Sequence, residues 1–176
     1  MPLIKHAALI EQFIRSAINT SATAEKITFS PEKLCLAIMG RCNEGEKVLL
    51  SLPEGENRQL FSALLEDNNV ITNPSGEQLK TTRTGVTMSF AGVISTGSVC
   101  LTMDENITAP VSILTQNHIT VVKGETLVNR PSDLFSEDYN KGKSFSFITG
   151  PSATADMGPL VRGVHGPGKL HIIILE

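Results

Sequence analysis

The sequence has 176 residues and a net charge of −3, with 15 basic and 18 acidic side chains, no tryptophan and one tyrosine. This length predicts one domain, or one domain with a small appendage. Scattered Lys and Arg with few aromatic side chains lack the basic, base-stacking surface of nucleic-acid-binding proteins, so we expect no nucleic-acid partner. There is no run of 18 apolar residues and no unbroken apolar leader, so we expect a cytoplasmic protein without membrane contact.

The chain opens with apolar residues at helical spacing. They are Leu3, Ala7, Ile10, Ile14 and Ala17, with polar residues on the opposite side. This pattern predicts an amphipathic helix that ends near residues 19–21. We assign residues 1–22 to this N-terminal helix and residues 23–176 to an α/β domain.

The next segments alternate between helix and strand. Ser30 and Pro31 predict the N-cap and first residue of a second helix, and Gly40 its end. Residues 47–52, KVLLSL, predict a buried strand. Residues 56–67, ENRQLFSALLED, predict a helix with Leu60, Leu64 and Leu65 on one face.

The second half of the chain is rich in β-branched and small residues. Residues 85–103, 117–128, 144–150 and 170–176 predict strands, and residues 129–144 resemble a linker in which Leu134 and Phe135 begin a short helix. Apolar runs separated by helices predict an α/β fold: a largely parallel sheet flanked by helices.

The thiols and most histidines suggest no metal or cofactor. Cys35, Cys42 and Cys100 are odd in number and too widely spaced for a zinc site or an iron–sulfur cluster, so we interpret them as reduced structural thiols. The three histidines at positions 6, 118 and 171 lack ligand-spaced neighbours, and we interpret them as packing or surface residues.

Polar groups concentrate between the last two apolar runs. Ser152 is placed to cap a helical turn over residues 153–157, whose free N–H groups would bind an anion at the C-terminal end of a strand. A structural reading explains Ser152 and Asp156 equally well, as groups that satisfy the backbone of the turn. His165 is either a base or anion donor, or a buried histidine that pairs with Asp156 to join two loops.

The turn STGS at residues 95–98 offers hydroxyl and N–H groups that suit an anion, although a tight structural turn is an equal alternative. Arg83 and Arg162 are candidate charge partners. No nucleophile lies beside His165 and no GxSxG motif is present, so we assign no catalytic residue. The candidate ligand-binding residues are Thr96, Gly97, Ser98, Gly150, Ser152, Thr154, Asp156, Arg162 and His165.

Two blocks resemble a known family. Residues 84–102, TGVTMSFAGVISTGSVCLT, resemble the strand–turn block of the LUD (lactate-utilisation) domain. Residues 148–176 contain GPSATAD and GVHGP before a final apolar strand, which resembles that family's terminal signature GPSxTxDIE followed by GVHGP. The similarity is strongest over residues 84–176.

The resemblance implies a fold of the NagB/RpiA/CoA-transferase-like type. It also implies a role in L-lactate or organic-acid utilisation as a subunit that carries no iron–sulfur cluster and binds a small anionic metabolite or iron–sulfur partner subunits. A homodimer is a further expectation. The sequence departs from the family at Ser95 and Gly158, where the family usually has acids.

Two alternatives remain open. One is an independent enzyme of the CoA-transferase or sugar-phosphate isomerase type, which would need a catalytic carboxylate; Glu105 and Glu125 are the nearest ones in the sequence, both in expected loops. The other is an assembly module whose cleft has lost its function.

Overall fold

The computed structural model describes residues 2–103, 107–135, 144–155 and 158–176. Its main feature is a six-stranded sheet in the order β1-β12-β7-β4-β2-β3, and every neighbouring pair is parallel. The strands are β1 (Thr23–Ile27), β2 (Val48–Leu50), β3 (Val70–Ile71), β4 (Thr84–Ser89), β7 (Asn117–Lys123) and β12 (Lys169–Leu175). This architecture confirms the predicted α/β fold with a largely parallel sheet flanked by helices.

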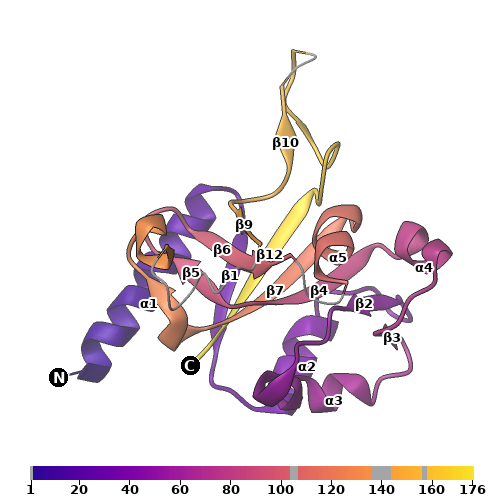
Figure 1. The fold of residues 1–176 in the computed structure, drawn as a ribbon, viewed down its shortest axis with the longest axis horizontal. Coiled ribbons are helices and arrows are strands. Elements are labelled where there is room, and N and C mark those ends of the chain that lie inside the picture. Colours follow the sequence, from indigo (N-terminus) through magenta and orange to yellow (C-terminus); the bar gives the residue numbers. More distant parts are fainter. Residues whose placement is uncertain (1, 104–106, 136–143, 156–157) are drawn as a thin grey trace.

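A second sheet of four strands has the order β8-β5-β6-β9. Its strands are β5 (Ala91–Val93), β6 (Ser98–Thr102), β8 (Leu127–Val128) and β9 (Phe145–Ile148). β6 is antiparallel to both β5 and β9. A two-stranded hairpin of β10 (Ala153–Thr154) and β11 (Val161–Arg162) extends away from the body of the molecule (Figure 1).

Helices and the second sheet cover the two faces of the main sheet, so its central strands are buried on both sides. One core cluster contains Ile119 and Val121 of β7, packed with α2 (Pro31–Met39), η1 (Gly55–Phe61) and α3 (Ser62–Leu65). The other contains Val122 of β7, packed with α1 (Pro2–Asn19) and with Val99 of β6. Figure 1 shows α1 and the α2–α3 pair on separate sides of the sheet.

The remaining elements are short. They are α4 (Gly76–Thr81), α5 (Thr108–Leu114), η2 (Gly124–Thr126) and η3 (Pro131–Leu134). α5 packs against β4. Among the described residues, no helix is long and apolar enough to cross a membrane.

Several local predictions are confirmed. α1 runs to Asn19, where the predicted break lies, and Ser30 caps α2 by accepting a hydrogen bond from the Lys33 N–H, with Pro31 next and Gly40 at the C-cap. The predicted strand segments 47–52 and 170–176 contain β2 and β12. Segment 117–128 begins with β7, but residues 124–126 form a 3-10 helix and residues 127–128 belong to the second sheet.

Other local predictions are wrong. Residues 55–61 form a 3-10 helix before the short α3, and Leu65 is exposed while Phe61 fills the core. Leu134 ends η3, so Leu134 and Phe135 do not begin a helix. The rest of the expected linker, residues 136–143, lies outside the described residues.

Candidate functional site

A cavity of about 840 Å³ opens at the amino edge of the main sheet. Three neighbouring strands begin there in register, because Lys169 lies opposite Asn117 and Asn117 lies opposite Thr84. The residues just before or at these strand starts therefore come together. The lining residues are Asn43, Arg83, Ile113, Leu114, Thr115, Gln116, Asn117, Arg162, Gly163, Val164, His165, Gly166, Gly168 and Lys169.

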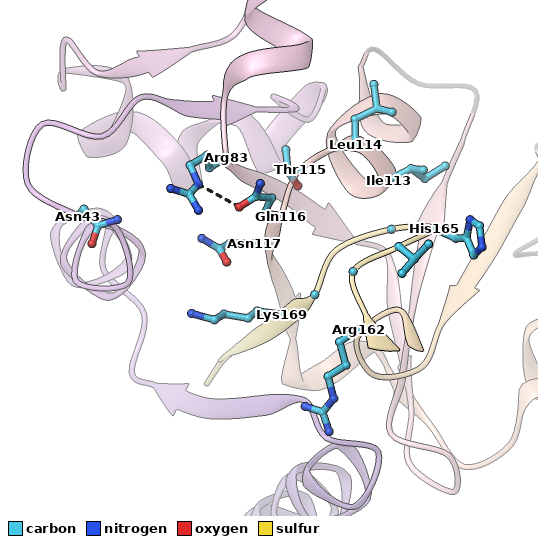
Figure 2. Close-up of a pocket in the computed structure, with 14 residues that line it drawn as sticks. Asn43, Arg83, Ile113, Leu114, Thr115, Gln116, Asn117, Arg162, His165 and Lys169 are labelled. Atoms are coloured by element: carbon cyan, nitrogen blue, oxygen red, sulfur yellow. Dashed lines mark hydrogen bonds between the residues drawn. The ribbon is translucent and has the colours of Figure 1, made fainter. Parts of the chain in front are cut away.

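The charge of this cavity is positive. Arg83, Arg162 and Lys169 line it, and no Asp or Glu is among the described lining residues. Arg83 Nε donates to Gln116 Oε1 at 2.9 Å, and Arg162 Nη2 donates to Ser21 Oγ at 3.1 Å. In Figure 2, Arg83, Asn117 and Lys169 follow one another along one side, whereas Arg162 extends away from them.

The carboxylate of Glu46 lies near this edge and has a structural role. Glu46 accepts hydrogen bonds from Thr84 Oγ1 at 2.6 Å and from the Asn43 backbone N–H at 2.9 Å and amide at 2.8 Å. Burial raises the pKa of Glu46, but these hydrogen bonds outweigh burial and leave the pKa below its usual value. Glu46 therefore stays ionised and holds the strand starts together.

A smaller cavity of about 410 Å³ adjoins the first, and the two share Ile113, His165 and Gly166. Its lining includes His118 and Leu170 from β7 and β12, Ser112 from α5, the end of β9 with the loop that follows it, and the loop at residues 165–167. These loops are joined through the backbone: Ser152 N–H donates to Pro167 O at 2.8 Å, and Gly163 N–H donates to Ser152 O at 3.0 Å.

His118 is the most unusual side chain of the smaller cavity, because it is 1% exposed. Its Nε2 is hydrogen-bonded to Thr87 Oγ1 at 2.8 Å, and burial lowers its pKa to about 4, so the ring is neutral at pH 7. Its Nδ1 is buried without a hydrogen-bond partner among the described residues. The sequence predicted a packing or surface role for His118; the structure shows it buried, and its place beside a cavity was not predicted.

The predicted terminal motif does gather at these cavities. Gly150, Ser152 and His165 line the smaller one, and Arg162 and His165 line the larger. Thr154 lies in the hairpin and lines neither. Asp156 lies outside the described residues.

The STGS turn lies outside the linings of both cavities at the amino edge, and its Ser95 lines a separate cavity of about 520 Å³. Gly97 has a φ of +67°, and a Cβ at this position would collide with the backbone of Ser16 and Ala17 near the end of α1. Thr96, Ser98 and Thr149 form a chain of hydroxyl groups with two contacts of 2.7 Å, and Thr149 lines the smaller cavity. The turn therefore packs against the end of α1, and Thr149 links it to the smaller cavity.

Two predictions about the terminal motif are wrong. Ala153 and Thr154 do not start a helical turn; they pair with Arg162 and Val161 in a hairpin. The motif follows the C-terminal end of a strand, as predicted, but this strand is β9 of the second sheet, so the motif reaches the amino edge of the main sheet. His165 is exposed, which contradicts a buried histidine.

A further cavity of about 470 Å³ lies at the carboxyl edge, where open α/β sheets usually bind ligands. Ser51 follows β2 there, Ser89 ends β4, and Glu54 contributes a carboxylate. Ser51 Oγ and Thr108 Oγ1 are 2.7 Å apart and satisfy each other. Glu54 is a carboxylate that sequence reasoning did not single out; Glu125 is exposed beside Lys123, and Glu105 lies outside the described residues.

The thiols and the acidic and histidine side chains form no metal centre within the described part of the chain, where no group of three or more ligands lies close together. Burial raises the pKa of Cys42 to about 11 and that of Cys100 to about 12, so both thiols stay protonated at pH 7.

Fold and site together define an α/β protein with a cationic cavity at the amino edge of a parallel sheet. The family model described as "LUD domain" matches residues 44–175, and the chain belongs to this family. A relative, lactate utilization protein C of Halalkalibacterium halodurans, is 33% identical over 100 residues, which cover 52% of this chain and 44% of the relative. The match thus spans less than half of that protein.

A solved structure shows the same fold. The crystal structure of a DUF162 family protein from Deinococcus radiodurans superposes with a TM-score of 0.71 at 16% identity, covering 97% of this chain and 98% of that one. The shared fold therefore extends over nearly the whole chain and beyond residues 44–175, which the family model matches.

Proposed function

We propose that this chain is a component of L-lactate or related organic-acid utilisation that binds a small organic anion in the cationic cavity. Membership of the LUD domain family and similarity to a lactate utilization protein support the pathway. The observation that carries the binding role is the cavity lining: Arg83, Arg162 and Lys169 with no carboxylate among the described residues. Cationic side chains attract a carboxylate and raise its local concentration.

Oxidation of lactate to pyruvate releases two electrons and two protons, so an electron acceptor is required. The three cysteines of this sequence are fewer than the four thiolates that usually bind a cluster. In this proposal, partner subunits that carry iron–sulfur clusters receive the electrons. Co-purification from the native host with cluster-containing proteins tests that part, and a chain recovered without them would contradict it.

The independent-enzyme alternative requires a carboxylate in the cleft. Neither cavity at the amino edge offers one among its described lining residues; Glu54 lies at the opposite edge. The variant Glu54→Gln distinguishes the two proposals. We expect it to leave anion binding at the amino edge unchanged, whereas an enzyme that uses the Glu54 carboxylate would lose its activity.

Calorimetry with L-lactate and pyruvate, in the wild type and in Lys169→Gln and Arg83→Gln, tests the binding role. We expect saturable binding in the wild type and about tenfold weaker binding in each variant, since each loses one charge-assisted contact. Lys33→Gln is the matched control, because Lys33 lies at the start of α2, after the carboxyl end of β1. Absence of binding, or equal losses in the control, would overturn the proposal.

A further inference from the structure

A hydroxyl group, an imidazole and a carboxylate are linked in a chain of hydrogen bonds where β1 pairs with β12. Thr23 and Glu25 lie on the same face of β1, and His171 of β12 is opposite Thr23 in register. Thr23 Oγ1 is 2.7 Å from His171 Nδ1, and His171 Nε2 is 2.8 Å from Glu25 Oε1. In this arrangement an imidazole, oriented by a carboxylate, activates a hydroxyl group as a nucleophile.

The charges of these groups fix where the protons lie. Burial raises the pKa of Glu25, but hydrogen bonds from His171 and Arg41 outweigh burial and leave the pKa below its usual value. Ionised Glu25 only accepts, so His171 Nε2 carries a hydrogen. Burial lowers the pKa of His171, so the ring is neutral at pH 7 and Nδ1 is an acceptor. Thr23 therefore donates to Nδ1; its other acceptor, Leu170 O, is farther away at 3.4 Å.

The hydroxyl group belongs to an exposed residue and the base to a buried one. Thr23 is exposed to solvent, whereas His171 is 6% exposed. A substrate thus has access to Thr23, while the ring of His171 stays shielded from water. The turn that precedes Thr23 is strained, because Ser21 has a φ of +69°, and strained backbone is frequent at active sites.

Two cations of the larger cavity lie beside this group. Arg162 donates to Ser21, which is two residues before Thr23. Lys169 is two residues before His171 on the same face of β12, a separation of about 7 Å along the strand. Both cations line the cavity (Figure 2). An anionic group that they attract brings the rest of its molecule close to Thr23.

We propose that Thr23 is the nucleophile of an acyl-transfer site, whose substrate is an ester of an organic acid that carries a second, free carboxylate. Thr23 Oγ1 attacks the ester carbonyl carbon, and its proton passes to His171 Nδ1. The bond from that carbon to the alcohol oxygen breaks, and Nδ1 returns the proton to the leaving alcohol. Water then attacks the acyl-Thr23 ester, and Nδ1 moves a proton from the water to Thr23 Oγ1 as the acid leaves. The activity goes beyond the proposed function but uses the same cations.

The hydrogen-succinate ester of p-nitrophenol is the probe, with p-nitrophenyl acetate as the matched ester that lacks the free carboxylate. We expect nitrophenolate release about tenfold faster with the succinate ester, because the cations concentrate it at the site. Mass spectrometry of peptides from the quenched wild type should show a succinyl group on Thr23.

Three threonine variants test the nucleophile. Thr23→Val keeps the β-branched shape and removes the hydroxyl group, so we expect it to lose the label. Thr23→Ser keeps the hydroxyl group and should retain the label. Thr81→Val is the control: Thr81 is exposed on α4, and its hydroxyl group donates to Glu77 O and contacts no base. We expect the control to react like the wild type.

The base and its orienting carboxylate are tested through rates. His171→Gln cannot take up the proton, so we expect acylation to slow by at least about a hundredfold. Glu25 is a positioning residue, and its hydrogen bond raises the pKa of His171 against the effects of burial and of Arg41. In Glu25→Gln we therefore expect the rate to decline at a lower pH than in the wild type, which loss of a purely structural contact would not cause.

The label in the wild type decides the inference even if Thr23→Val does not fold. A succinyl group on lysine side chains alone, or no label at all, would overturn it, as would equal rates in the wild type and His171→Gln. Binding of L-lactate without acylation of Thr23 would leave the proposed function standing. Acylation of Thr23 without binding of L-lactate or pyruvate would leave this inference standing and overturn the binding role proposed above.

Discussion

His118 stays neutral in the folded protein because the sheet and α5 exclude water from its ring. Thr87, Thr120 and Ser89 continue its hydrogen bonds along the same face of the sheet, with Ser89 Oγ and Thr120 Oγ1 2.7 Å apart. All four side chains are almost fully buried. Such a network is favourable only while each member keeps its protonation state, since a buried charge has no solvent to stabilise it.

This burial predicts a pH dependence of stability. The pKa of His118 falls from 6.5, the ordinary value, to about 4 in the folded protein. Between these pH values the unfolded chain binds a proton that the folded chain does not, so the free energy of unfolding falls as the pH drops from 6.5 to 4. The full loss is about 3 kcal/mol.

Urea unfolding at pH 7, 5.5 and 4.5 measures this loss, with His118→Gln as the reference. Burial also lowers the pKa of His171, but His171 is present in both proteins and its contribution cancels in the difference. We expect the wild type to lose more stability than the variant below pH 6.5. Parallel pH profiles would show that His118 is not buried and neutral.

α1 lies outside the region that the family model matches, yet it forms part of the hydrophobic core. Ile10, Phe13 and Ala17 are fully buried in the cluster that includes Ile172 and Ile174 of β12. Helices of this kind gain their stability from the packing of one apolar face. α1 therefore stabilises the domain that follows it.

Phe13→Ala tests this role. We expect it to lower the free energy of unfolding by about 3–5 kcal/mol, because it leaves a cavity in a close-packed core. Ile18→Ala on the same helix is the control: Ile18 is 53% exposed, so we expect a loss of at most about 1 kcal/mol. Similar small losses in both variants, measured by urea unfolding, would mean that α1 does not support the domain.

The elements also show what sequence alone can predict. β7 and β12 are rich in β-branched apolar residues, so their burial could be inferred directly. The pairing of β5, β6, β8 and β9 in a separate sheet could not, because short apolar strands do not encode their partners. The position of the terminal motif at the amino edge depends on that second sheet, and so does the cavity beside His118.

At the scale of the whole molecule, a cationic cavity lies in a chain of net negative charge. The side chains of Arg83, Arg162 and Lys169 are exposed to solvent. Dissolved salt therefore screens their attraction for anions. An anionic ligand is drawn to this edge at low ionic strength and is less favoured at high ionic strength.

We expect the dissociation constant for L-lactate to rise several-fold between about 20 and 300 mM NaCl, over which the Debye length shortens from roughly 20 to 6 Å. Calorimetry across this range measures the slope. Lys169→Gln should give a shallower slope, since it removes one of the charges that salt screens. A salt-independent affinity would indicate binding by neutral contacts and not by these cations.

Contacts at the end of α1 determine which residues a chimera between this chain and a relative must include. Gly150 has a φ of +68° and fits so closely against Thr20 O that a Cβ there would collide, while Arg162 donates to Ser21. The loop beside the smaller cavity thus packs against residues that precede the matched region 44–175. A chimera that contains only the matched region would lack the residues that this loop packs against. The chimera must therefore also include the first 22 residues of this chain.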